Sequence, residues 1–130
     1  MSALWATALA GLLHYLLGAA WFTPLFGRAW DRSIGHDRSR AGGRFPLGYY
    51  LLPLVGALVT AAVIALLHPS GAGAVPGLLT GTAVGLVAAA ASFTNALTPH
   101  TPHPYLLGAI TGGYHLVGGA SAGTTIGFLA

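Results

Sequence analysis

Every charged side chain of this sequence lies between residues 28 and 44, and long uncharged stretches flank that segment on both sides. A soluble domain carries about a quarter charged residues, whereas 5% of this chain is charged and 55% is hydrophobic. Such a chain cannot cover itself with a water-facing surface, so we expect it to lie in a lipid bilayer. The charged residues are Arg28, Asp31, Arg32, Asp37, Arg38, Arg40 and Arg44.

Four uncharged apolar runs have the length of a membrane crossing, which takes roughly 20 residues. They cover about residues 4–26, 47–67, 75–97 and 105–129. Backbone groups in lipid must be paired internally, so these runs are expected to be helices. The sequence therefore predicts an all-α fold: a single transmembrane domain over residues 1–130, built as an integral membrane four-helix bundle. No positive charge precedes the first run, so we expect it to remain as a helix instead of being cleaved as a signal peptide.

The arginines predict the orientation of these helices. Short loops rich in Arg stay on the cytoplasmic side, which places residues 27–46 inside and both termini outside. Most Trp and Tyr residues fall at the predicted cytoplasmic ends, where an interfacial aromatic belt is expected. Phe26, Trp30 and Ile34 recur every four residues, and this spacing is typical of a short interfacial helix. The arginines beside them are expected to contact anionic lipid headgroups.

Glycine spacing predicts how the helices pack. Gly73, Gly77, Gly81 and Gly85 follow one another every four residues in the third run, and the fourth run carries Gly112, Gly119 and Gly123. In lipid, helix association depends on van der Waals packing between small residues. We therefore expect glycine-rich contacts between the third and fourth helices. The same stripes could instead form a homodimer face or bind a membrane partner protein.

Two histidines are the best candidates for a functional site. His14 and His115 both lie in the pattern G-x-x-H-x-x-x-G, and each adjoins a tyrosine, Tyr15 or Tyr114. His14 lies about 10 Å from the cytoplasmic end of its helix and His115 about 15 Å from that of its own, so both approach the middle of the bilayer. An ionisable residue there is a functional hypothesis by default, and Asn95 is added as a polar candidate. The alternative that we favour is structural, with each imidazole bonded across the helices.

Nothing in the sequence assigns catalysis. The chain has no cysteine, and its apolar runs contain no Asp or Glu, which leaves a zinc site short of ligands. Phosphate-binding loops and Ser-His-Asp arrangements are missing too. We therefore expect no enzyme activity, no cofactor and no metal. Five arginines in one short segment do not form the broad basic face that nucleic-acid binding needs, so nucleic acid is not an expected partner.

Two short segments resemble the DUF1761 family of small bacterial membrane proteins of unknown function. The segment from Trp21 to Trp30, which reads WFTPLFGRAW, is similar to that family's W-[YF]-S-P-x-x-F-G-[KR]-x-W signature, although it is one residue shorter after Pro24. Residues 110–117, ITGGYHLV, look like the family's I-N-x-G-Y-H-L-V segment, with Thr111 in place of Asn. The resemblance implies a four-helix layout and a bacterial cytoplasmic membrane, but no activity. The positions it marks are Trp21, Pro24, Phe26, Gly27, Arg28, Trp30 and Gly113, together with Asn95, Tyr114 and His115.

Two functions follow from these features. The first, which the sequence favours, is a multi-pass structural or interaction subunit whose glycine stripes are the contact surfaces. The second is a small transporter or ligand-binding membrane protein in which His14, Tyr114 and His115 line a midplane site. A polar cavity reaching these residues would favour the second function, and a closed set of helices the first.

Overall fold

A computed structural model of the chain describes residues 2–40, 42 and 44–130. Position 1 of the predicted domain and positions 41 and 43 of the predicted loop lie outside the described residues. The described residues form helices and no strand, which confirms the all-α prediction. The elements are α1 (Ala3–Ala20), a π-helical turn η1 (Trp21–Leu25), α2 (Gly27–Ile34), α3 (Gly48–Leu67), α4 (Ala74–Ala96) and α5 (Pro104–Leu129).

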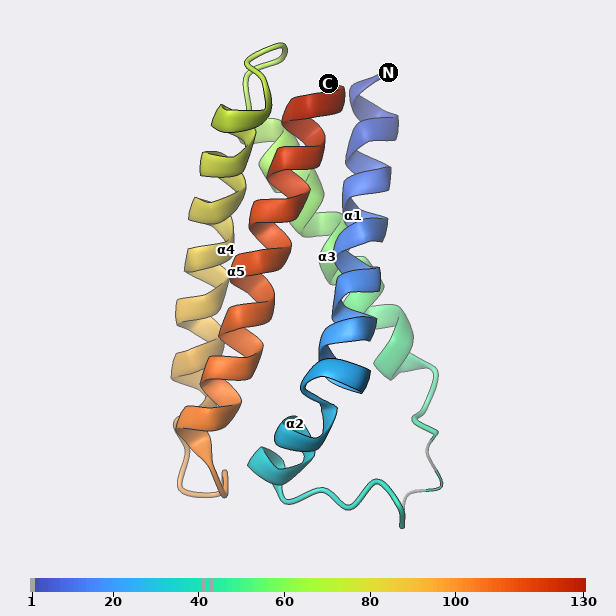
Figure 1. The fold of residues 1–130 in the computed structure, drawn as a ribbon, viewed down its shortest axis with the longest axis vertical. Coiled ribbons are helices and arrows are strands. Elements are labelled where there is room, and N and C mark those ends of the chain that lie inside the picture. The colour runs from blue at the N-terminus through green and yellow to red at the C-terminus, as the bar shows by residue number, and fades with distance from the viewer. Residues whose placement is uncertain (1, 41, 43) are drawn as a thin grey trace.

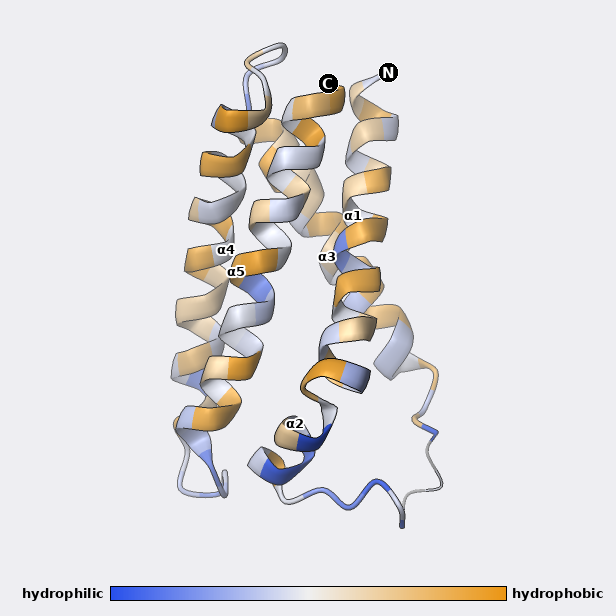
Figure 2. Cartoon of the chain, viewed as in Figure 1, coloured by the Kyte–Doolittle hydropathy of each residue, from blue (hydrophilic) through white to orange (hydrophobic). Residues whose placement is uncertain are grey.

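The four long helices alternate in direction (Figure 1). Both termini and the α3–α4 turn lie at one end of the molecule, here called the terminal end. The short helix α2, the segment after it and the α4–α5 connection lie at the other, here called the charged end. Hydrophilic residues gather on α2 and the segment after it, whereas the long helices are mainly hydrophobic (Figure 2).

Three helical spans are long and apolar enough to cross a membrane. Among the described residues these are Ala3–Leu25, Gly48–Leu67 and Ala74–Ala96. The fourth long helix, α5, is longer than any of them, but its sequence is interrupted by glycine, serine, threonine and histidine. It also contacts all of α1, α2, α3 and α4, so protein covers much of its surface. A helix that meets protein on several sides does not need a continuous apolar surface for lipid.

The first predicted helix, about residues 4–26, corresponds to one helical span over Ala3–Leu25, but its last turn is π-helical. The α-helix ends at Ala20 and a π-turn follows, in which the Phe26 N–H donates to the Trp21 carbonyl at 2.8 Å. Pro24 lies inside this turn. Because proline has no N–H and its ring clashes with the preceding helical turn, the chain widens to a π-turn there. The chain then enters α2, the short helix that the spacing of Phe26, Trp30 and Ile34 predicted.

The helix α2 is fixed at its end and along one side. Gly35 adopts a left-handed conformation with φ of 70°, and the His36 N–H donates to the Asp31 carbonyl at 2.9 Å, which closes the helix with a Schellman-type bond. The fully buried Ser33 accepts a 3.1 Å hydrogen bond at its carbonyl from the N–H of His103. This bond connects α2 to the start of α5 and holds α2 at the charged end of the long helices.

The glycines of α4 and α5 face one another, as their spacing predicted. A Cβ atom added at Gly81 would meet the Gly119 carbonyl oxygen and lie 2.8 Å from the Cα of Gly123. One added at Gly123 would likewise meet the Gly77 carbonyl oxygen. Any side chain would therefore push the two backbones apart. We call this contact the glycine seam; it comprises Gly77, Gly81 and Gly85 of α4 with Gly119, Gly123 and Gly127 of α5.

A small aliphatic core fills the terminal end between α1, α3 and α5. Its members are at most 2% exposed and are small or β-branched. Residues of this size let three helices approach closely, so the terminal end closes without aromatic side chains. The core consists of Ala10, Ala61, Ile64, Ala122 and Ile126.

Candidate functional site

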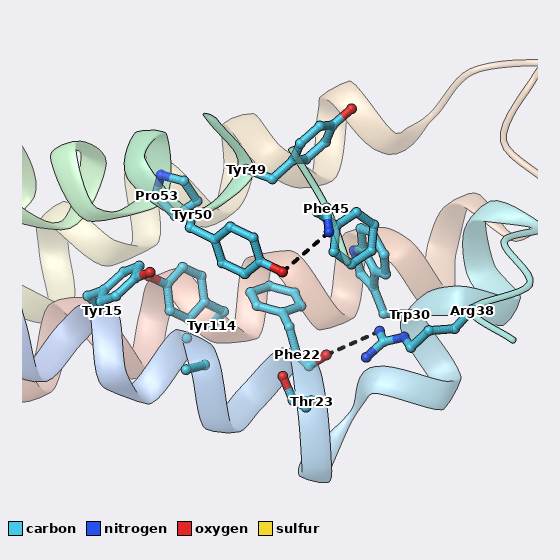
Figure 3. Close-up of a pocket in the computed structure, with 12 residues that line it drawn as sticks. Tyr15, Phe22, Thr23, Trp30, Arg38, Phe45, Tyr49, Tyr50, Pro53 and Tyr114 are labelled. Atoms are coloured by element: carbon cyan, nitrogen blue, oxygen red, sulfur yellow. Dashed lines mark hydrogen bonds between the residues drawn. The ribbon is translucent and has the colours of Figure 1, made fainter. Parts of the chain in front are cut away.

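A cavity of about 560 Å³ lies toward the charged end, between α1, η1, α2, α3, α5 and the segment before α3. Its volume falls within the roughly 300–1,000 Å³ that is typical of small-molecule sites. Seven of its twelve lining residues are aromatic, so most of its surface consists of ring faces and edges (Figure 3). The lining residues are Tyr15, Gly18, Ala19, Phe22, Thr23, Trp30, Arg38, Phe45, Tyr49, Tyr50, Pro53 and Tyr114.

Phe22 connects the two ends of this cavity. Its ring centroid lies 5.2 Å from that of Tyr114 and 6.3 Å from that of Trp30, and both ring pairs meet edge to face. Such pairs contribute roughly 0.5–1.5 kcal/mol beyond the area they bury. Figure 3 shows Tyr15 and Tyr114 at one end of the cavity and Arg38 at the other. The π-turn matters here because it carries Phe22 between α1 and α2.

Arg38 is the charged group that lines the cavity, and its side chain is held in place. The Nε and Nη2 atoms donate to the two carboxylate oxygens of Asp31 at 2.8 and 2.9 Å, and Nη2 also donates to the Phe22 carbonyl at 3.4 Å. The Arg38 side chain is 33% exposed and that of Asp31 14%. A bidentate pair of this kind fixes the plane of the guanidinium. It therefore links the segment after α2 to the π-turn.

Gly27 makes room for this arrangement. A Cβ atom there would lie 2.8 Å from the Phe22 carbonyl oxygen and 3.5 Å from Nη1 of Arg38. Any other residue would therefore displace the backbone that Arg38 binds. The glycine singled out by the family signature thus has a steric role beside the cavity.

Trp21 fixes the start of the π-turn against α5. Its Nε1–H donates to the Ile110 carbonyl at 2.9 Å, and its ring lies 3.1 Å from where a Cβ of Gly113 would stand. The Phe26 ring packs against the Trp21 ring, with 4.7 Å between the two ring centroids. These residues of the family signature therefore position the cavity wall without lining it. Arg28, by contrast, is exposed at the start of α2.

His14 and His115 both lie close to Tyr114. The Tyr114 ring is 5.0 Å from each imidazole, measured between ring centroids. His14 is only 2% exposed, and a Cβ at Gly118 would collide with its Nε2 atom. Among the described residues neither ring nitrogen of His14 has a hydrogen-bond partner. The bond across the helices that the structural interpretation requires is therefore not observed at His14.

The structure brings together most, but not all, of the predicted site residues. Tyr15 and Tyr114 line the cavity, while His14 and His115 lie close to Tyr114 without lining it. Asn95 is exposed near the end of α4 and is not among the residues that line the cavity. Within the described part of the chain, no cluster of three or more His, Asp or Glu side chains could hold a metal ion.

Nine of the twelve lining residues were missed as site candidates, although one signal was visible. Tyr49 and Tyr50 were assigned to an interfacial aromatic belt; both are exposed, and both also line the cavity. Phe45 joins them through the Tyr50 hydroxyl, which accepts a 3.4 Å hydrogen bond from the Phe45 N–H. The clustering of rings at one depth was thus the signal that could have found them. No sequence pattern distinguished Arg38, another missed residue, from the charged residues around it.

Two of the remaining charged residues form an exposed pair close to Arg38 in the sequence. Asp37 and Arg40 lie 3.1 Å apart, and the Ser39 hydroxyl donates to the Asp37 carboxylate at 2.5 Å. That hydrogen bond lowers the pKa of Asp37, because it favours the charged form. Asp37 is thereby held ionised and paired on the surface.

Comparison with known proteins gives the family and no activity. Neither a curated protein nor a solved structure matches the chain. The model of a protein family described as "Protein of unknown function (DUF1761)" matches residues 5–127, which is nearly the whole chain. The resemblance of the two short segments is thus confirmed over the full set of helices, and the chain belongs to the DUF1761 family.

Proposed function

We propose that this protein is a small-molecule-binding protein of the bacterial cytoplasmic membrane, and that the aromatic cavity is its binding site. In this proposal α1, α3, α4 and α5 all cross the bilayer as a four-helix bundle. The charged end lies in the cytoplasm and both termini lie outside. The three apolar spans and the arginines confined to one end support this arrangement.

The cavity carries the proposal. A scaffold protein would present its glycine stripes to a partner, but the stripes of α4 and α5 are already packed against each other within this chain. The cavity, in contrast, is large, lined by rings and bordered by a fixed guanidinium. Predominantly aromatic walls with a few placed polar groups are typical of ligand sites.

The polar groups at the two ends of the cavity give a bound molecule its orientation. Tyr15 and Tyr114 contribute hydroxyl groups at the deep end (Figure 3). Close to Tyr114, the buried His14 has two ring nitrogens without partners in the described residues. A buried group of this kind in a native protein calls for a water or a ligand. The fixed charge of Arg38 lies at the opposite end, so in this proposal the polar group of a ligand stays at the charged end and its apolar part extends among the rings.

The test is photo-cross-linking with a fatty alcohol and a fatty acid that carry the same diazirine-bearing tail. We expect both probes to label cavity residues such as Phe22 and Tyr50, with labelling mapped by mass spectrometry. Ala19→Phe, which places a ring on the cavity wall, should reduce this labelling several-fold. Ala62→Phe on the exposed side of α3 is the matched control and should change nothing. Labelling spread over the exposed faces of all helices, and equal in both variants, would refute the proposal.

A further inference from the structure

We propose that the ligand is a single-chain amphiphile with an oxyanion headgroup, bound with its tail among the aromatic rings and its anion on Nη1 of Arg38. The inference rests on the proposed ligand-binding function and adds the chemical class of the ligand. Three observations carry it: the unused edge of the guanidinium, the sign of the surrounding charge, and the layout of the cavity.

The guanidinium of Arg38 is only partly used by the protein. It has five N–H donors, and the hydrogen bonds to Asp31 and to the Phe22 carbonyl occupy those on Nε and Nη2. Nη1 has no acceptor among the described residues. The Arg38 side chain is 33% exposed and lines the cavity. Arg38 is therefore oriented in advance, and two of its donors remain available.

The charge around the cavity mouth favours an anion. Five arginines and two aspartates lie in residues 28–44, so this segment carries the whole formal net charge of +3. Both carboxylates are already paired: Asp31 with Arg38, and Asp37 with Arg40. A cationic headgroup would meet the same aromatic rings but no uncommitted carboxylate in the described part of the chain. Charge complementarity thus selects the oxyanion over the ammonium.

The shape of the cavity fits a headgroup at one end and a tail along the rest. Arg38 lies at the charged end, while Phe22, Tyr15 and Tyr114 continue the wall toward the middle of α1 and α5 (Figure 3). Tyr49, which is 65% exposed, forms part of the rim. An amphiphile from the adjacent leaflet can therefore keep its head at the interface as its tail enters. A free anion would use Arg38 but leave the ring-lined volume unfilled.

The experiment compares four photo-cross-linking probes that share one tail and differ in the headgroup: carboxylate, phosphate, alcohol and trimethylammonium. We expect either anion to label the cavity about tenfold or more better than trimethylammonium, since a hydrogen bond to a charged group is worth that much. Acetate and inorganic phosphate, used as competitors without a tail, should not displace the anionic probes. Displacement by these free ions at probe concentrations would contradict the amphiphile assignment.

Two variants distinguish direct binding of the anion by Arg38 from attraction by the net positive charge of the whole segment. The double variant Asp31→Asn/Arg38→Gln removes one charge of each sign, so the segment keeps its net charge of +3. We expect it to reduce the anion preference to about one while the alcohol probe still labels the cavity. Arg40→Gln lowers the net charge by one at an exposed residue and should leave the preference in place.

The outcomes distinguish the two proposals. If no probe labels the cavity of the wild-type chain, the proposed ligand-binding function fails. If all four headgroups label it equally, only the oxyanion assignment fails. If the anion preference persists in Asp31→Asn/Arg38→Gln but falls in Arg40→Gln, the preference comes from the surface field and the role of Arg38 is refuted.

Discussion

The glycine seam and the aromatic cavity lie on different sides of the same helix, α5, and they use opposite kinds of side chain. Along the seam, Gly119 and Gly123 let the backbone of α5 approach that of α4 until no side chain fits between them. On the other side, Tyr114 projects toward α1 and packs against Phe22 and His14. There, rings separate the helices and a cavity of about 560 Å³ remains.

Under the proposed function, this difference lets a short chain hold its helices firmly together and still leave room for a ligand. The seam supplies dense backbone packing, the main source of helix association where lipid offers no hydrophobic drive. The aromatic end can then stay open because it is not required to hold the helices together. α5 belongs to both regions, so the seam holds in place the part of the cavity wall that α5 contributes.

The largest effect is expected where the seam is disrupted. Gly81→Ala places a methyl group against the Gly119 carbonyl and 2.8 Å from the Cα of Gly123, and overpacking of this kind costs about 1–3 kcal/mol. Gly56→Ala on α3 is the matched control, because a Cβ there meets no described atom within 4 Å. It should stabilise the helix by up to about 1 kcal/mol.

The measurement for both variants is the free energy of unfolding in detergent, with the ligand absent. Equal stability of Gly81→Ala and Gly56→Ala would mean that α4 and α5 do not meet at their glycines. The contrast between the two regions would then be lost.

A smaller effect of opposite sign is expected beside the cavity. His14 is buried without a hydrogen-bond partner in the described residues, and an unpaired polar group of this kind costs about 1–3 kcal/mol. His14→Leu should therefore raise the free energy of unfolding of the ligand-free protein by about 1 kcal/mol. Trp5→Phe, at an exposed position of the same helix, should leave it unchanged. A loss of stability in His14→Leu would instead show that the imidazole bonds to protein and has a structural role.

The sequence was sufficient where a local pattern determines the contact. Glycines every four residues share one helix face whatever surrounds them, so the approach of Gly81 to Gly123 could be predicted. The uncharged runs predicted four crossings, and three helical spans in the described residues are long and apolar enough to make one. The π-turn around Pro24 was not predicted because hydropathy continues across it, although proline itself was the signal. The polar residues of α5 are explained by its contacts with the other helices, and the sequence alone does not reveal those contacts.

The cavity could not be predicted because its wall is assembled from distant segments. Tyr15, Tyr50 and Tyr114 belong to three different helices, and only the fold decides whether their rings face lipid or one another. The same limit applies to Arg38, whose sequence neighbours are also charged. Conversely, Asn95 looked comparable to Tyr114 in the family pattern, but lies at an exposed position on α4.

The most direct test of the contrast uses the absence of native cysteine. A single cysteine is introduced at Ala19 on the cavity wall or at Ala122 in the closed core, and its rate of reaction with a small uncharged maleimide is measured in lipid vesicles. The account predicts fast modification of Ala19→Cys, slowed by an anionic amphiphile, and no modification of Ala122→Cys over the same time. Equal rates at the two positions, or a rate at Ala19→Cys that the amphiphile does not change, would contradict it.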